Sequence, residues 1–183
     1  MLRNGYARTV KGGVIMQIKV KRVFDAKINV SGVTLLSVQQ VLFMQQVMFV
    51  PKDITKCNYD KCDYNYWWLR SPGYGSSYAA DVNIFGYVNT VGNYVYDTYS
   101  VVRPALEISN PESSELAIGD RFNLFGYDWT VIFRDMALCD TGIGRHRFDP
   151  ERNNWEASEL KTWLEDWLKE KMAEAEGRLP ERL

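Results

Sequence analysis

The chain has 183 residues, which is the length of one domain or of two small ones at most, and enough to bury a hydrophobic core. Lysine and arginine number 22 against 23 for aspartate and glutamate, so the formal net charge is −1. This balance lacks the basic footprint of a non-specific nucleic-acid binder, and no nucleic-acid partner is expected. Hydrophobic residues at 46% and charged residues at 25% exclude global disorder, collagen and coiled coil.

The chain carries no sign of membrane insertion, secretion or metal binding. Its longest apolar runs, between Val41 and Val50, are far shorter than a membrane span, and the first twenty residues show no secretory signal. Three cysteines are too few for a disulfide framework, and no second pair of ligands completes a zinc site. We therefore expect free thiols, no metal and no cofactor. The cysteines are Cys57, Cys62 and Cys139.

The first elements follow from hydrophobic periodicity. Apolar and polar residues alternate from Val14 to Val20, which predicts a half-buried strand. From Val33 to Phe49 the apolar residues fit a short helix opened by Ser37, although the valine content leaves a strand open. The polar stretch from Pro51 to Tyr66 predicts a loop. Glycines then punctuate short apolar runs from Trp67 to Ile108, which predicts strands and tight turns without a helix.

The second half of the chain predicts a hairpin and a helix. Residues 122–133 fit a hairpin, and residues 141–147 form a predicted glycine-rich loop. From Leu160 to Met172 apolar residues recur every three or four positions, with charged residues between them. This pattern predicts an amphipathic helix packed on a core. Its expected N-cap is Ser158 or Asn154, and its expected end is marked by Gly177 and Pro180.

Residues 74–101 have an unusual composition. Lysine, glutamate, glutamine, tryptophan and methionine make up 38 of the 183 residues, so a window of 28 residues should hold about six of them. It holds none. The residues present are those reached when the first two bases of an asparagine codon, AAC or AAT, are replaced at random. The alternative explanation of this composition is strand propensity, which favours tyrosine, valine and threonine. Strand propensity does not explain the asparagine, aspartate, glycine and serine in the same window.

Two motifs flank this window. Trp67-Trp68-Leu69-Arg70-Ser71-Pro72-Gly73 precedes it, and Val102-Arg103-Pro104-Ala105-Leu106 closes it. With Ala79, Ala80, Val82, Gly86 and Val88 between them, these motifs resemble the invariant frame of the diversity-generating retroelement variable proteins of phages and gut bacteria. That family overlaps a domain of unknown function widespread in Firmicutes and their prophages. The resemblance implies an α+β, C-type lectin-like fold with small twisted antiparallel sheets, long loops and two helices. In the family, adenine-directed errors of reverse transcription rewrite the asparagine codons, and the rewritten side chains form a ligand-binding face.

The order of the blocks departs from the family. The block from Gly119 to Met172 normally precedes the tryptophan motif, whereas here it follows. We expect one C-type lectin-like domain over residues 1–183, circularly permuted, because permutation is tolerated where chain ends lie close together. The alternative is that the chain holds parts of two successive domains. In the single-domain interpretation, residues 14–108 form the variable-region block, 109–118 a linker, 119–176 the hairpin and helix block, and 177–183 a tail.

The window has the composition of a binding surface, because tyrosine brings large amphipathic area at low rotamer cost while serine and asparagine adapt their hydrogen bonding. A surface-packing role for the tyrosines is the alternative. The predicted ligand-binding residues are Tyr74, Ser76, Ser77, Tyr78, Asp81, Asn83, Phe85, Tyr87, Asn89, Thr90, Asn93, Tyr94, Tyr96, Asp97 and Tyr99. The predicted frame consists of Trp67, Trp68, Val82, Val88, Val102 and Pro104, with Arg70 and Arg103 satisfying buried carbonyls or carboxylates.

Taken together, the resemblance implies a recognition protein on a phage virion or a bacterial cell surface, whose partner is a host-cell surface protein or glycan, with a homo-oligomer possible. A structural phage module of the same fold, with a face that is not diversified, is the first alternative. The second is an enzyme of the formylglycine-generating type, for which the cysteines lack a matching motif. Cys139, Asp140 and His146 lie close in sequence, but one thiol and one imidazole on a loop are weak evidence of catalysis, and no catalytic residue is predicted.

Overall fold

The protein is described by a computed structural model over residues 6–10, 13–20, 26–46, 54–59, 65–109 and 116–177. Within these ranges the chain forms an α+β fold of two sheets and two α-helices, as the sequence predicts. The larger sheet has the strand order β1 (Tyr6–Val10), β2 (Gly13–Val20), β3 (Ala26–Thr34), β8 (Ala105–Ser109), β11 (Met136–Cys139), β10 (Tyr127–Phe133) and β9 (Arg121–Leu124). Each of its neighbouring pairs is antiparallel.

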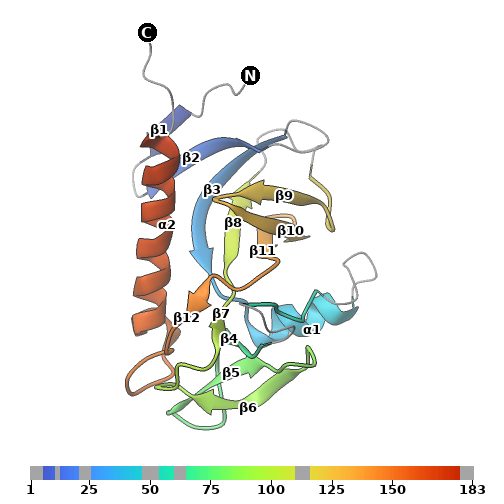
Figure 1. Cartoon of the computed structure of the whole chain (residues 1–183), viewed down its shortest axis with the longest axis vertical. Helices are drawn as coiled ribbons and strands as arrows, with labels where there is room; N and C mark the ends of the chain where they lie inside the picture. Colours follow the sequence, from blue (N-terminus) through green and yellow to red (C-terminus); the bar gives the residue numbers. More distant parts are fainter. Residues whose placement is uncertain are drawn as a thin grey trace.

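The smaller sheet has the strand order β12 (Gly144–Arg145), β7 (Val101–Val102), β4 (Trp67–Pro72), β5 (Tyr78–Val82) and β6 (Val88–Tyr94). Strands β4 and β7 are parallel, and the other neighbours are antiparallel. Figure 1 shows this sheet at the lower end of the molecule, below the larger sheet. The described strands of both sheets come from both halves of the chain, because β12 joins the smaller sheet and β3 and β8 lie beside β11 in the larger one.

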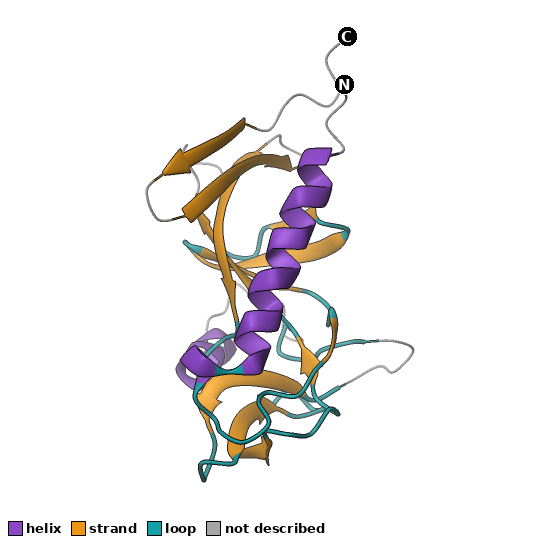
Figure 2. Cartoon of the chain, turned by 90° about the vertical axis from the view of Figure 1, so that its left-hand side faces the viewer, coloured by secondary structure: helices purple, strands orange, loops and turns teal. Residues whose placement is uncertain are grey.

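Helix α2 (Glu159–Gly177) runs along the larger sheet, and Figure 2 shows it lying across the face of that sheet. It is the amphipathic helix predicted from the sequence, and Leu160, Leu164 and Leu168 are its buried residues. Both predicted caps are used, but for different elements. Ser158 Oγ accepts a hydrogen bond from the Lys161 amide at 3.1 Å at the start of α2. Asn154 instead caps the short 3-10 helix η1 (Trp155–Ala157) through the Glu156 amide.

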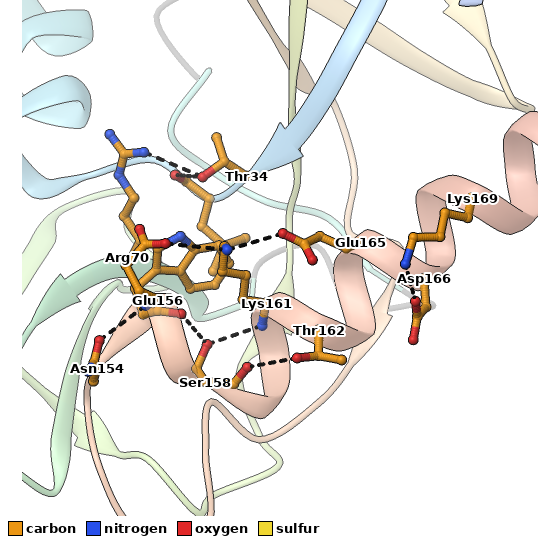
Figure 3. A network of polar contacts seen from close by, with 12 residues as sticks. Thr34, Arg70, Asn154, Glu156, Ser158, Lys161, Thr162, Glu165, Asp166 and Lys169 are labelled. Carbon is orange, nitrogen blue, oxygen red and sulfur yellow. Dashed lines mark hydrogen bonds and ion pairs between the residues drawn. The ribbon is translucent and has the colours of Figure 1, made fainter. Parts of the chain in front are cut away.

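Ion pairs on the solvent side hold the same junction together, as Figure 3 shows. Lys161 Nζ lies 3.3 Å from Glu156 Oε2 and 3.2 Å from Glu165 Oε1, so one ammonium bridges η1 and the second turn of α2. Surface pairs of this kind contribute less than about 1 kcal/mol each. Their role here is to fix the direction in which α2 leaves η1, while the apolar face provides the stability.

The first helix is shorter than predicted. Helix α1 (Val38–Gln46) begins after Ser37, but Val33 and Thr34 belong to β3. Residues 47–49 of the predicted helix lie outside the described residues. The reason for the difference is long-range pairing: Val33 lies opposite Leu106 and Thr34 opposite Ala105 in β8, so residues 33–34 complete strand β3. A short apolar run does not distinguish strand from helix by its own periodicity.

The other strands predicted from the sequence are present within the described ranges. The hairpin predicted at 122–133 is β9 and β10, and its turn contains Phe125 and Gly126 at φ 56° and 82°. The strand predicted at 14–20 is β2, and the stretch from Trp67 to Ile108 contains five strands and no helix. The predicted loop at 141–147 contains the two-residue strand β12. Residues 110–115 of the linker, residues 60–64 with Cys62, and Pro180 lie outside the described part of the chain.

The described residues form two hydrophobic cores. The large core lies under α2 and includes Ile28, Leu106, Trp129, Leu160 and Trp68. The small core lies under α1 and includes Leu36, Val41, Val82, Ile132 and Trp67. Strand β4 stands between them, so the strand that begins the predicted frame is anchored from both sides.

Candidate functional site

The candidate site is built on the tryptophan pair at the start of β4. Both indoles are fully buried, as predicted for frame residues. Trp67 Nε1 donates to the Thr55 carbonyl at 2.9 Å, and Trp68 Nε1 donates to the His146 carbonyl at 2.8 Å. Each ring therefore buries its apolar area and satisfies its single polar atom. The two bonds tie the loop at Thr55 and the loop at His146 to the strand that supports the window.

Arg103 closes the frame at the opposite end. Its side chain is 1% exposed, and its guanidinium donates to the carbonyls of Cys139 at 2.7 Å, Ile54 at 2.5 Å and Asp140 at 3.4 Å. It also lies 5.1 Å from the centroid of the Trp67 ring. The prediction that Arg103 satisfies buried carbonyls is confirmed. Arg70 differs, because it is half-buried and bonds to the side-chain oxygens of Thr34 and Gln40.

On this frame the window presents aromatic rings to solvent. Tyr74 is 86% exposed, Tyr99 77%, and Tyr87 and Phe85 67% each. These exposed fractions are high for such large side chains. Large apolar groups that gather in one exposed region mark interaction surfaces. Ser76 and Thr90 are also exposed, whereas Ser77, Asn83, Asn89, Asn93 and Asp97 are half-buried.

Three of the tyrosines form a stack. Tyr78 on β5 lies directly opposite Tyr94 on β6, with ring centroids 4.4 Å apart, and Tyr94 stacks on Tyr96 at 5.1 Å. A hydrogen bond with Tyr94, helped by desolvation, raises the pKa of Tyr78 to about 12. Tyr78 is therefore a neutral phenol at ordinary pH. The stack restricts the rotamers of Tyr94 and Tyr96. These side chains therefore lose less conformational entropy when a ligand binds.

Asp81 corrects the sequence prediction. It was expected to face a ligand, but its side chain is fully buried, because β5 is covered on both faces and lies between β4 and β6. Asp81 Oδ2 accepts hydrogen bonds from Asn93 Nδ2 at 2.6 Å and Asn89 Nδ2 at 3.4 Å, while Oδ1 is buried without a partner. Burial raises the pKa of this carboxyl to about 7, although the Asn89 bond acts in the other direction.

The asparagines of the window are engaged in holding its turns. Asn83 Oδ1 accepts from the amides of Phe85 at 2.9 Å and Tyr87 at 3.1 Å, so it shapes the turn between β5 and β6. Asn89 Oδ1 accepts from the Gly92 amide at 3.2 Å. Gly92 has φ +81°, and a Cβ there would lie 2.1 Å from the Ala79 carbonyl oxygen. These side chains position the tyrosines, in addition to any contact of their own.

Sequence reasoning missed a supporting residue from the second half of the chain. Asn153, just before η1, donates through Nδ2 to the carbonyls of Gly75 at 2.9 Å and Tyr78 at 2.8 Å. Its own amide donates to the Ser76 carbonyl at 2.9 Å. The turn that carries Tyr74 and Ser76 is thereby pinned to the base of α2. Nothing in the sequence marks Asn153, since it is one of two adjacent asparagines in a polar loop.

A hollow of about 250 Å³ opens between Tyr66 and the end of the window. It is lined by Tyr66, Asn93, Asp97, Tyr99 and Ser100. Three of these were predicted as ligand-binding residues, whereas Tyr66 and Ser100 were not. Ser100 is 1% exposed and its hydroxyl has no hydrogen-bond partner. The composition signal that marks the window gives no indication of which serine or tyrosine borders a hollow.

Cys57, Cys139 and His146 do not line this hollow. Cys139 is fully buried in β11, and burial raises the pKa of its thiol to about 12. Burial also raises the pKa of Cys57, whose thiol is free, as predicted. His146 stacks on Trp163 of α2 at 5.2 Å, and its Nε2 lies 3.5 Å from Glu159 Oε1. Within the ranges described above, no three His, Cys, Asp or Glu side chains are grouped to hold a metal ion.

Comparison with known proteins adds one match. Residues 33–110 match a family described as "Domain of unknown function (DUF6273)". The matched segment runs from the end of β3 to just beyond β8, so it contains the tryptophan pair, the window and Arg103. No curated protein and no solved structure matches the chain. Among the described residues, no helix has both the length and the apolar character needed to cross a membrane.

Proposed function

We propose that the protein is a ligand-binding recognition protein, and that its binding face is the surface of residues 74–99 that displays tyrosines on a C type lectin-like frame. The observation that carries this proposal is the contrast in burial within residues 67–99. Asp81, Val82 and the tryptophan pair beneath are fully buried, whereas Tyr74, Tyr87 and Tyr99 extend into solvent. Rigid aromatic anchors on a fixed scaffold are the arrangement of a paratope.

The frame supports variation of the side chains it carries. The turn that carries Tyr74 is held by backbone hydrogen bonds, from the Gly73 amide to the Tyr78 carbonyl at 2.7 Å and from the Tyr74 amide to the Val91 carbonyl at 2.9 Å. Replacing the side chain of Tyr74 leaves both bonds in place. A backbone that tolerates substitution of its side chains supports diversification of the window. Separately, both sheets contain strands from both halves of the chain, which supports a circularly permuted single domain.

The enzymatic alternative is less favoured. A reactive cysteine needs a lowered pKa and access to substrate, but Cys139 and Cys57 are buried and their pKa values are raised. We propose that the partner is a protein or glycan on a host-cell surface and that the chain acts on a phage virion or a bacterial cell surface.

Binding of the fluorescently labelled whole chain to a panel of intact bacterial strains tests this function. The double variant Tyr74→Ser/Tyr87→Ser should bind at least tenfold more weakly to any strain that binds the wild type, because exposed aromatic anchors dominate such interfaces. Its melting temperature should stay unchanged, since both rings are exposed. The matched control is Leu42→Ser/Ile118→Ser, which removes exposed apolar groups outside the window and should bind as the wild type does.

Diversification has its own test in the genome. A template repeat with AAC or AAT at the window positions, beside a reverse transcriptase gene, would support a diversified face. Absence of such a repeat, together with self-association that Tyr74→Ser/Tyr87→Ser disrupts, would favour the alternative of an assembly module.

A further inference from the structure

We infer that Tyr78 and Tyr94 form a site of oxidative cross-linking, at which a one-electron oxidant joins the two rings by a carbon–carbon bond. The bond ties strand β5 to strand β6 within one chain. This inference goes beyond the proposed recognition function and does not depend on it, because it concerns the chemistry of the tyrosine stack and not the ligand of the window.

The backbone holds the two rings against each other. Tyr78, the first residue of β5, lies directly opposite Tyr94, the last residue of β6. Side chains that face each other across an antiparallel pair lie on the same face of the sheet. The ring centroids are 4.4 Å apart with 36° between the ring planes, which is at the short end of the range of about 4.5 to 7 Å for aromatic pairs. Carbon atoms of the two rings are therefore in contact, and coupling needs only a small movement of the side chains.

The phenol groups favour coupling at the right carbon atoms. A hydrogen bond with Tyr94, helped by desolvation, raises the pKa of Tyr78 to about 12. Tyrosyl radicals couple through the carbon next to the one that bears the hydroxyl. A contact between the two hydroxyl ends of the rings brings these carbons together. The geometry therefore favours the ortho–ortho bond of dityrosine.

The stack is accessible to an oxidant in solution. Tyr94 is 42% exposed and Tyr96 is 51% exposed. Tyr96 stacks on Tyr94 with 5.1 Å between the ring centroids and 17° between the planes. Electrons pass readily between rings in contact, so an oxidation at Tyr96 is transferred to Tyr94. Two successive oxidations at the exposed rings thus supply one radical to Tyr78 and one to Tyr94.

The reaction is a balanced two-electron oxidation. Each phenol gives one electron to the oxidant and its hydroxyl proton to water, and the two phenoxyl radicals form one carbon–carbon bond. The hydrogen on each coupled carbon then moves to the phenol oxygen, which restores both hydroxyl groups. With a haem peroxidase as catalyst, hydrogen peroxide takes up the two electrons and two protons and becomes two water molecules. The cross-linked chain has lost two hydrogen atoms.

The cross-link closes the open end of a hairpin. Asn83 shapes the turn that joins β5 to β6 at one end, and Tyr78 and Tyr94 lie at the other. A covalent bond there restricts the unfolded chain in the way that a disulfide across a loop of similar length does. The cross-linked protein should therefore melt at a temperature higher by about 5 °C.

Treatment of the full chain at micromolar concentration with a haem peroxidase and hydrogen peroxide tests this inference. We expect dityrosine fluorescence on a chain that still runs as a monomer in a denaturing gel. Cleavage before Asp81 separates Tyr78 from Tyr94 in the sequence, so their two fragments should stay joined and weigh two hydrogen atoms less than their sum. Fragmentation of this product in the mass spectrometer identifies the two linked tyrosines.

Phenylalanine variants keep the ring and remove the phenol. Tyr78→Phe and Tyr94→Phe should each lower the yield of dityrosine within the chain at least about tenfold, because two groups held in contact react at a far higher effective concentration than groups on separate molecules. The matched control is Tyr99→Phe, which removes the hydroxyl of a 77% exposed tyrosine outside the stack and should leave the yield unchanged. Unchanged melting temperatures of the untreated variants show that the fold is kept.

Four results would overturn the inference. They are dityrosine only between chains, a link that maps to Tyr94 and Tyr96, a yield that Tyr78→Phe does not lower, and a cross-linked chain with an unchanged melting temperature. Binding of Tyr74→Ser/Tyr87→Ser to bacterial strains is a separate measurement. The recognition function can therefore fail while the cross-link forms, and the reverse.

Discussion

Trp67 and Trp68 are consecutive in the chain, yet their side chains lie in different hydrophobic cores. Successive side chains of a strand point to opposite faces, so the pair places one indole in the small core under α1 and one in the large core under α2. The strand beneath the tyrosine face is thereby fixed from both sides. Strand β4 is also the middle strand of the smaller sheet.

This arrangement predicts that the two tryptophans act independently despite being neighbours. Trp67→Phe and Trp68→Phe should each lower the free energy of unfolding by about 2 kcal/mol, because each removes buried volume and leaves a carbonyl without its donor. The double variant should show the sum of the two effects to within about 0.5 kcal/mol, as independent sites do. Urea unfolding of the four proteins measures this. A coupling energy above about 1 kcal/mol would mean that the two cores communicate through β4.

Asp81 should make stability fall as the pH rises. Its folded-state pKa of about 7 lies above the ordinary value of 3.8, so the folded protein binds the proton more tightly than the unfolded chain. The stabilisation is complete below about pH 4 and is lost as the pH rises towards 7, after which it stays lost. Asp81→Asn keeps an acceptor for Asn89 and Asn93 and has no such dependence.

The measurement compares the wild type with Asp81→Asn at several pH values. The difference between their unfolding free energies should shift in favour of the variant between about pH 4 and pH 8, by an amount on the order of 4 kcal/mol. Comparing the two proteins removes the contribution of carboxyls with lowered pKa, such as Asp149 and Glu159. If the difference in unfolding free energy did not vary with pH, Asp81 would have the same pKa in the folded and the unfolded chain, which would contradict this prediction.

Arg103 and Arg70 occupy similar places in the two flanking motifs but should respond differently to lysine. Arg103→Lys should cost about 3 kcal/mol or more, because one ammonium cannot reach three carbonyls that lie around a fully buried guanidinium. Arg70→Lys should cost less than about 1 kcal/mol, since its partners are side chains at a half-buried position. Thermal unfolding of both variants provides the comparison. Equal losses would contradict the role assigned to Arg103.

Gly92 and Gly126 form a matched pair for testing the window backbone. Both have positive φ, at +81° and +82°, so alanine introduces the same left-handed strain of about 1 kcal/mol at either position. A Cβ at Gly126 meets nothing within 4 Å, whereas at Gly92 it would lie 2.1 Å from the Ala79 carbonyl oxygen. Gly92→Ala should therefore lose about 1 to 3 kcal/mol more than Gly126→Ala in denaturant unfolding. Similar losses of unfolding free energy in the two variants would show that strands β5 and β6 move apart to accommodate the Cβ at position 92 with little energetic penalty.

Local pattern was sufficient for part of this fold. The alternation at β2, the amphipathic pattern of α2 with its cap at Ser158, and the hairpin of β9 and β10 were all predictable, because each is decided by residues close together in the chain. The burial of the tryptophan pair was also predictable, because large apolar side chains are usually buried in a folded domain.

Tertiary contacts decided the rest. The extension of β3 through Thr34 depends on pairing with β8, about seventy residues away, and the burial of Asp81 depends on β4 and β6 enclosing β5. Asparagine was expected to face a ligand, but Asn83 and Asn89 bond within the turns, because their partners become available only when the hairpin closes.

The sequence by itself determined where the tyrosine-rich window lies, because composition is a property of neighbouring residues. Only the tertiary structure brought Tyr66, Asn93 and Ser100 to one hollow and left the Ser100 hydroxyl unpaired. Hydrogen-bond satisfaction depends on every group within about 3.5 Å in space, and most of those groups are distant in the chain.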